Sequence, residues 1–222
     1  MRIAFLVHVF PELTEAFILN QVTGLIDAGH EVDVYASRAG KSSKVHADVD
    51  RYRLLERTRY WDFPHSYLLR AIKALGLMRK NGWRRAALSL SSLYASVRFL
   101  RQQRYDVVHC QFGTLAPAAA ALRDIDAVSG GLVVSFRGWD LTSRRAGTLN
   151  YQEVFEKAHL LLPVCESFKA RLIERGCDPR KIRVHHSGIK LPLFAYRTRR
   201  RTTNEPVRVL SVGRLVEKKG VA

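Results

Sequence analysis

Short apolar runs typical of β-strands alternate with helical segments along most of this chain. Residues 2–10 form an apolar run, residues 14–28 carry apolar side chains at helical spacing, and residues 31–36 alternate apolar with polar side chains. A strand, a helix and a second strand in this order form a βαβ unit, whose two strands lie parallel in one sheet. Further strands are predicted at residues 106–110, 132–136, 159–164 and 182–186, with a weaker candidate at 49–55. The pattern predicts an α/β fold, a Rossmann-like doubly wound parallel sheet with helices on both faces.

The chain is expected to divide after residue 186. Residues 187–206 contain prolines and closely spaced arginines, which indicate a linker between domains. Residues 207–222 begin with an apolar run, VRVLSV, that leads through Gly213 into a basic turn. A strand followed by a glycine and basic residues is how an α/β domain begins a phosphate site. We therefore expect a complete domain at 1–186, followed by a linker and then by the first strand and phosphate loop of a truncated domain.

Basic residues dominate the charge of the chain, whose formal net charge is +17. Thirteen Arg or Lys residues and two acidic residues lie between Arg51 and Tyr105. Residues 64–80 and 83–104 are predicted as two basic amphipathic helices, whose apolar faces pack on the core and can also rest on a membrane interface. Such a charge favours an anionic partner, either nucleic acid, an acidic substrate or an anionic membrane surface, although a solvated basic face also explains it.

Three kinds of sequence feature are not found, and each disfavours a class of protein. The turn between the first strand and the first helix lacks the GxGxxG fingerprint, which disfavours a nicotinamide or flavin cofactor. The three cysteines lack metal-ligand spacing, so we expect reduced thiols and no metal site. Neither a secretory signal nor an apolar run long enough to span a membrane is recognisable, so a cytoplasmic location is expected.

The carboxyl ends of the predicted strands indicate where a ligand binds. In a doubly wound sheet the ligand crevice lies outside these ends. They carry His109 near the end of one strand, Gln111 directly after it, and the turn from Arg137 to Asp140 after the next strand. These side chains are therefore the candidates for a binding or catalytic site.

Several motifs, taken in order, give the chain a resemblance to a known family. The motifs are FPELTEAFILNQ, GHEVDVYA, VVHCQFG, VVSFRGWDL, LLPVCESFKARLIERGCDPRKIRVHHSG and VGRLVEKKG. With these motifs the chain resembles the glycosyltransferases of the GT-B architecture, family 4, particularly the members that build exopolysaccharides and colanic acid. The resemblance extends over nearly the whole chain and is strongest in the final motif, a Gly-Arg followed by a Lys-Gly after a strand.

The resemblance implies that the chain is the N-terminal half of a retaining glycosyltransferase of the hexosyltransferase type. Such an enzyme moves a sugar from a nucleotide-sugar donor to a lipid-linked or polysaccharide acceptor in cell-surface glycan biosynthesis, with no metal or other cofactor. The N-terminal domain holds the acceptor and the C-terminal domain holds the donor. The expected place is cytoplasmic and peripheral, at the anionic inner surface of the cell membrane. Because most of the donor domain is absent, we expect negligible transferase activity from the 222 residues alone.

The resemblance also assigns donor residues in the final turn. Arg214 and Lys219 would bind the donor diphosphate, with Gly213 in the same turn. A fixed guanidinium and ammonium stabilise the charge that develops on the departing diphosphate. The alternative is a solvated basic turn without a ligand.

Four residues of the N-terminal domain are candidates for the acceptor side. Glu15 and His109 are expected to bind the acceptor, although His109 can equally be a hydrogen-bonded histidine at a strand end. Arg137 stands where related enzymes often carry a histidine near the reacting carbon, and arginine cannot act as a general base. Either Asp140 or a substrate oxygen then takes the proton, or Arg137 only orients anionic groups. A simple pairing of Arg137 with Asp140 across the turn is the structural alternative.

Two other classes of function compete with an enzyme. A basic nucleic-acid-binding module is suggested by the charge alone, but the sequence has no recognisable RNP, helix-turn-helix or zinc-finger signature, and we expect no nucleic-acid partner. A non-catalytic remnant that persists as a folded domain is the third possibility.

Overall fold

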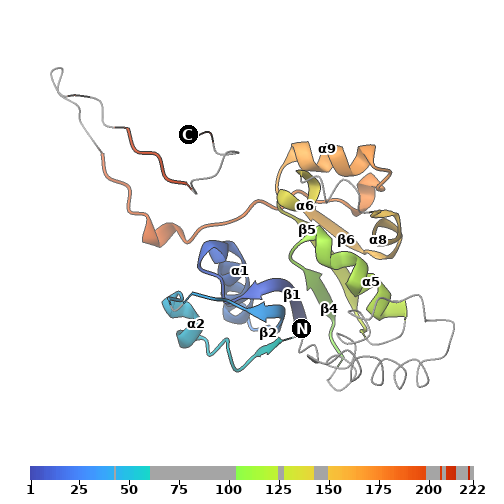
Figure 1. Cartoon of the computed structure of the whole chain (residues 1–222), viewed down its shortest axis with the longest axis horizontal. Coiled ribbons are helices and arrows are strands. Elements are labelled where there is room, and N and C mark those ends of the chain that lie inside the picture. Colours follow the sequence, from blue (N-terminus) through green and yellow to red (C-terminus); the bar gives the residue numbers. More distant parts are fainter. Residues whose placement is uncertain are drawn as a thin grey trace. The chain divides into compact units, whose positions relative to one another are not determined.

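The structure is a computed structural model, and it describes residues 1–42, 44–60, 104–124, 128–142, 150–198, 206, 209–213 and 220. Within these residues six parallel strands form one sheet in the order β3-β2-β1-β4-β5-β6 (Figure 1). The strands are β1 Arg2–Phe10, β2 Glu31–Ala39, β3 Thr58–Tyr60, β4 Val107–Cys110, β5 Gly131–Phe136 and β6 Leu160–Pro163. This confirms the predicted Rossmann-like α/β fold with a parallel sheet.

The helices connect successive strands, as a parallel sheet requires. The predicted helix at 14–28 consists of the 3-10 turn η1 and the helix α1. The described helical elements are η1 Leu13–Glu15, α1 Ala16–Asp27, α2 Ala47–Arg51, η3 Gly113–Leu115, α5 Ala116–Asp124, α6 Trp139–Thr142, α8 Gln152–Lys157, α9 Glu166–Glu174, η4 Pro179–Lys181 and η5 Leu191–Leu193.

The central strand β1 separates two hydrophobic layers. Its side chains alternate, so that Ala4 and Leu6 enter one core cluster while Ile3, Phe5 and Val7 enter the other. The first cluster contains the buried residues of α5 and α8, and the second contains those of α1 and α2. Helices therefore cover both faces of the sheet, which is why its strands are almost continuously apolar.

The strand order reverses between β1 and β4. From β1 the chain proceeds outward through β2 and β3 on one side, and from β4 outward through β5 and β6 on the other (Figure 1). Ligands of open α/β sheets bind beside such a reversal, outside the carboxyl ends of the strands. The residues that follow β1, β4 and β5 are therefore the candidates for a ligand-binding site.

Two minor strand predictions are wrong. Residues 49–55 are not a strand, because Ala47–Arg51 forms the helix α2 and the edge strand β3 begins later, at Thr58. Only Val49 and Leu54 of the segment are buried, and two buried residues separated by an odd number of positions do not give the period-two alternation of a strand. Residues 182–186 run beside β6 without forming a strand; Ile182 makes an isolated bridge to Leu161.

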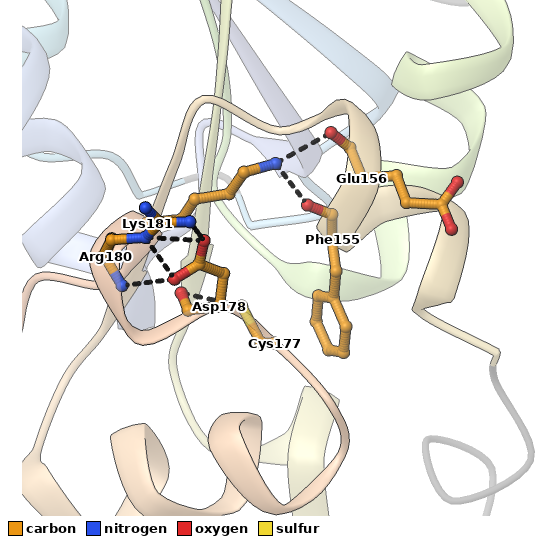
Figure 2. Close-up of polar contacts among 6 residues, drawn as sticks. All are labelled: Phe155, Glu156, Cys177, Asp178, Arg180 and Lys181. Atoms are coloured by element: carbon orange, nitrogen blue, oxygen red, sulfur yellow. Dashed lines mark hydrogen bonds and ion pairs between the residues drawn. The ribbon is translucent and has the colours of Figure 1, made fainter.

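Polar contacts fix the start of this last segment (Figure 2). The ammonium group of Lys181 donates to the carbonyl oxygens of Phe155 and Glu156, at 2.7 and 2.8 Å, near the end of α8. The carboxylate of Asp178 accepts from the backbone N–H of Arg180 at 2.9 Å and caps the turn η4. Lys181 binds carbonyl oxygens that are left free at the helix end, and Asp178 caps the turn. Both contacts restrict the path of the chain that follows.

The chain separates into two compact units, Met1–Ile189 and Lys190–Ala222. In the second unit the described residues 209–213 belong to no helix or strand, and Val209, Leu210 and Val212 are exposed. The linker at 187–206 and the truncated domain at 207–222 stay predictions. The two basic helices predicted at 64–80 and 83–104 lie almost wholly outside the described residues. In the part of the chain that is described, no helix has the length and apolar character needed to cross a membrane.

Candidate functional site at the carboxyl ends of the strands

Arg137, the first residue after β5, gathers side chains from distant parts of the chain. Its Nη2 donates to Oε1 of Gln111 at 2.6 Å and to Oε1 of Gln21 at 3.1 Å. Its Nη1 donates to Oγ of Ser187 at 3.1 Å, and the guanidinium lies 4.5 Å from the ring centroid of Phe17. The helix α1, the ends of β4 and β5 and the segment beyond β6 therefore meet at one guanidinium.

The charge of Arg137 is held without a salt bridge among the described residues. Its hydrogen-bond partners are neutral oxygens, and an aromatic face supports it from one side. Burial lowers the pKa of Arg137 to about 10, while the charges of Asp140 and Glu15 act in the opposite direction. The side chain is therefore still a cation at neutral pH, fixed in place before any ligand arrives.

Asp140 is fully buried and binds backbone, not the guanidinium. Its Oδ1 accepts from the N–H of Arg137 at 3.0 Å and of Gly138 at 2.8 Å, and its Oδ2 accepts from the N–H of Gly113 at 3.0 Å. Gly138 has a φ of 133°, a conformation that favours glycine. The carboxylate thus ties the turn after β5 to the turn after β4. This geometry gives Asp140 a positioning role, and proton transfer by Asp140 stays a prediction.

His109 is buried within the sheet. Its Nε2 pairs with Oγ of Ser135 on the neighbouring strand at 2.9 Å, and its ring lies 5.0 Å from the ring of Phe5. Burial, followed by the charges of Arg137 and His185, lowers the pKa of His109 to about 3. The imidazole is therefore neutral at physiological pH, as in the alternative of a hydrogen-bonded histidine at a strand end. Acceptor binding by His109 stays a prediction.

Glu15, the last residue of η1, has a carboxyl oxygen without a hydrogen-bond partner. This Oε2 is buried, and burial together with the charge of Glu12 raises the pKa of Glu15 to about 7, against the opposing effect of Arg137. The residue also lines a hollow of about 290 Å³, open space included, whose walls are mostly apolar side chains. Those side chains belong to Phe10, Pro11, Leu13, Ile18, Leu19, Val45 and Val49.

Three residues at this edge are not singled out by the sequence. Gln21 and Ser187 complete the contacts of Arg137, and His8, near the end of β1, pairs with Oγ1 of Thr114 at 2.7 Å. Burial and the charge of Arg38 lower the pKa of His8, whereas the charge of Asp140 raises it. A histidine inside an apolar run, close to the carboxyl end of its strand, was a usable signal for His8. Gln21 and Ser187 gave no comparable signal.

Comparison with known sequences decides the family. The model of the family described as Glycosyltransferase Family 4 matches residues 14–192. The chain belongs to glycosyltransferase family 4. This confirms the resemblance inferred from the motifs.

Two curated relatives of this family-4 chain match over its full length. WcaL of Salmonella typhimurium, a provisionally named colanic acid biosynthesis glycosyltransferase, is 34% identical, and the amylovoran biosynthesis glycosyltransferase AmsK of Erwinia amylovora is 30% identical. The chain spans 58% of the length of each relative.

Solved structures support the fold of the family-4 chain. HepE of Anabaena, solved in complex with UDP and glucose, aligns with a TM-score of 0.58 at 13% identity. The alignment covers 87% of this chain and 46% of HepE. At this identity the match concerns the fold alone.

The donor residues predicted for the family-4 chain are not among the side chains described at this site. Arg214 and Lys219 lie outside the described residues, and Gly213 is exposed in the second unit. Their assignment to the donor diphosphate stays a prediction. Of the acceptor-side candidates, the structure brings Glu15 and Arg137 within electrostatic reach of each other and fixes Asp140 at the backbone of Arg137.

Proposed function

We propose that this chain is the acceptor-side domain of a retaining, hexosyl-transferring enzyme. The enzyme moves a sugar from a nucleotide-sugar donor to a lipid-linked or polysaccharide acceptor in cell-surface glycan biosynthesis. The observation that carries the proposal is the hydrogen bond between Arg137 and Gln111, which lies where the strand order of a family-4 sheet reverses. The charge of Glu15 also acts on Arg137.

The relatives support the classes of donor and acceptor. WcaL and AmsK are named for two exopolysaccharides, colanic acid and amylovoran, which favours a glycan acceptor here. HepE has been solved with UDP and with UDP-glucose, which favours a nucleotide-sugar donor. A domain that spans 58% of the relatives would share the reaction with the remainder of the protein.

Each candidate residue has a role in this proposal. Arg214 and Lys219, in the turn that begins at Gly213, neutralise the charge that develops on the departing diphosphate. Glu15 and His109 belong to the acceptor side.

Arg137 supplies a fixed positive charge beside the reacting groups, and Asp140 holds the backbone of Arg137 in register. A preorganised charge of this kind lowers a barrier because no reorganisation is needed during the reaction. No step of the scheme requires a metal ion.

The proposed location is the cytoplasmic face of the inner membrane. Its support is the excess of basic residues between Arg51 and Tyr105, which an anionic lipid surface would attract. Retention on liposomes containing anionic lipid, lost as salt is raised and absent with duplex DNA, is the expected result. Equal retention on DNA would favour the nucleic-acid-binding alternative.

The decisive experiment joins the chain to a complete C-terminal donor domain and screens nucleotide sugars for protection against thermal unfolding. A donor present at 100 times its dissociation constant should stabilise the native state by about 2.7 kcal/mol. The 222-residue chain alone should show neither this shift nor measurable turnover. The absence of a shift with every nucleotide sugar in this two-domain protein would contradict the proposed function.

A further inference from the structure

The hollow beside Glu15 lies at the carboxyl end of β1, within the first compact unit. Its walls are formed by the end of β1, the turn η1, the helix α1 and the residues at the start of α2. Its volume of about 290 Å³, open space included, is near the lower end of the roughly 300–1,000 Å³ found for ligand pockets. The hollow therefore has the size of a short segment of a ligand and not of a whole lipid.

The hollow has an apolar floor and an apolar rim. Leu19 and Val49 are buried in the core cluster beneath it, whereas Leu13 and Val45 stay 41% and 39% exposed. The Nε2 of His46 donates to the carbonyl oxygen of Leu13 at 2.9 Å and joins η1 to the start of α2. Covering the exposed apolar surface of this rim with hydrocarbon is favourable, because it removes that surface from water.

The ionisable carboxyl groups of the hollow disfavour an anionic ligand. Glu12 and Glu15 line it, and no lysine or arginine is among its lining residues. Burial, followed by the charge of Glu12, raises the pKa of Glu15 to about 7, while the charge of Arg137 lowers it. Oε2 of Glu15 is buried without a hydrogen-bond partner, so no donor at this oxygen stabilises the ionised form. A phosphate in the hollow would be repelled by the ionised carboxyl groups, whereas an uncharged hydrocarbon would not.

A sugar also fits these walls poorly. Each hydroxyl group of a sugar needs hydrogen-bond partners once it is removed from water. The side chains of the hollow that can supply them are Glu12, Glu15 and His46, and the imidazole already donates to the carbonyl oxygen of Leu13. The remaining lining side chains are apolar, so the hollow matches a hydrocarbon chain better than a sugar ring.

We propose that this hollow binds a segment of the hydrocarbon chain of a lipid-linked acceptor. The inference rests on the proposed function and selects the lipid-linked class of acceptor over the polysaccharide class. The bound chain covers Leu13 and Val45, and the carboxyl group of Glu15 beside it is protonated. The phosphate and the sugar of the acceptor lie outside the hollow.

The test is a titration of the 222-residue chain observed by nuclear magnetic resonance. The methyl signals of Leu19, Val45 and Val49 are followed while octyl glucoside, below its micellar concentration, or methyl glucoside is added to about 10 mM, a range suited to millimolar dissociation constants. Octyl glucoside should shift the three signals saturably, and methyl glucoside, which has the sugar without the chain, should not. No saturable shift with octyl glucoside, or equal shifts with both glucosides, would overturn the proposal.

Vesicles of phosphatidylcholine distinguish an acceptor chain from membrane lipid. They offer acyl chains in a bilayer without an attached sugar, and they should leave the three methyl signals unchanged. If the vesicles perturb these signals as octyl glucoside does, the hollow takes up membrane lipid and its assignment to the acceptor is wrong.

Two leucine variants test whether the rim makes the contact. Leu13→Asn replaces an apolar side chain that lines the hollow, and the affinity for octyl glucoside should fall about fivefold. Leu55→Asn is the matched control, because Leu55 is 50% exposed but does not line the hollow, and its affinity should equal that of the wild type. Equal affinities in the two variants would contradict binding at this rim.

The pH dependence of binding tests the state of Glu15. Because hydrocarbon beside the carboxyl group favours the protonated form, the affinity for octyl glucoside should be severalfold higher at pH 6 than at pH 8, up to about tenfold for a pKa of about 7. Glu12, His46 and Arg137 also carry or acquire charge near this group, so Glu15→Gln is measured in parallel and should lose the dependence. An equal or higher wild-type affinity at pH 8 would be evidence against a hydrocarbon at this position.

These results are independent of the donor screen. Thermal protection of the two-domain protein by a nucleotide sugar, together with a negative octyl glucoside titration, would leave the proposed function standing and remove only the hydrocarbon site. The titration of the wild-type chain decides the matter even where a variant does not fold.

Discussion

Acidification should destabilise the domain through His109. The pKa of this buried imidazole lies at about 3, against an ordinary value of 6.5. Below pH 6.5 His109 is protonated in the unfolded chain but stays neutral in the folded chain. The free energy of unfolding therefore decreases as the pH falls from 6.5 to 3. Between pH 7 and pH 5 the loss from this residue amounts to about 2 kcal/mol.

The measurement is urea-induced unfolding followed by circular dichroism at pH 7 and pH 5. Other groups also titrate in this range, so the informative quantity is the difference between the wild-type chain and His109→Gln. The free energy of unfolding of the wild-type chain should fall by about 2 kcal/mol more than that of the variant. His186→Gln, at an exposed position, controls for the loss of one imidazole. Equal losses in the wild type and His109→Gln would refute the argument from burial.

Three further changes test the architecture of the site. Asp140→Asn replaces the carboxylate that accepts from the backbone N–H groups of Arg137, Gly138 and Gly113. The change should lower the free energy of unfolding, measured in urea, by about 2–4 kcal/mol. A loss below about 0.5 kcal/mol would contradict the positioning role of Asp140. Gly113→Ala places a methyl group against the ring of Phe136 and should cost about 1–3 kcal/mol in the same assay, whereas an unchanged midpoint would show that the ring yields freely. Glu15→Gln should stabilise the chain by about 1 kcal/mol at pH 8 and have little effect at pH 4. The pKa of Glu15 is raised to about 7, so ionisation of the carboxyl group destabilises the folded chain only as the pH rises from 4.5 through 7. The effect stays near 1 kcal/mol, or about that, because solvent screens the partly exposed carboxyl group. A thermal unfolding series against pH checks this sign, and equal shifts at both pH values would contradict it.

The sequence located the sheet well because strand formation here depends on local pattern. The apolar runs of β1, β2, β4 and β5 bury both faces in a parallel sheet, and such runs are recognisable without knowledge of the neighbours. The short edge strand β3 was missed. It consists of Thr58–Tyr60, and three residues are too few to show a period.

The candidate site was predicted only in part. The rule that ligands bind at carboxyl strand ends indicated His109, Gln111 and the turn at Arg137, all of which lie at that edge. It could not separate a histidine paired with Ser135 from a ligand-binding one, nor show that the carboxylate of Asp140 is taken up by backbone. These distinctions depend on which donor lies opposite each oxygen.

By itself the sequence determined the alternation of strands and helices, the parallel sheet and membership of glycosyltransferase family 4, since periodicity and motifs are local properties of the chain. Only the tertiary structure decided which side chains surround Arg137. Gln21, Gln111 and Ser187 lie 116, 26 and 50 residues away in sequence, and the paths of α1, β4 and the segment beyond β6 bring them together. A hydrogen bond between such positions exists only after the sheet has packed, because its geometry depends on the packing of several elements at once.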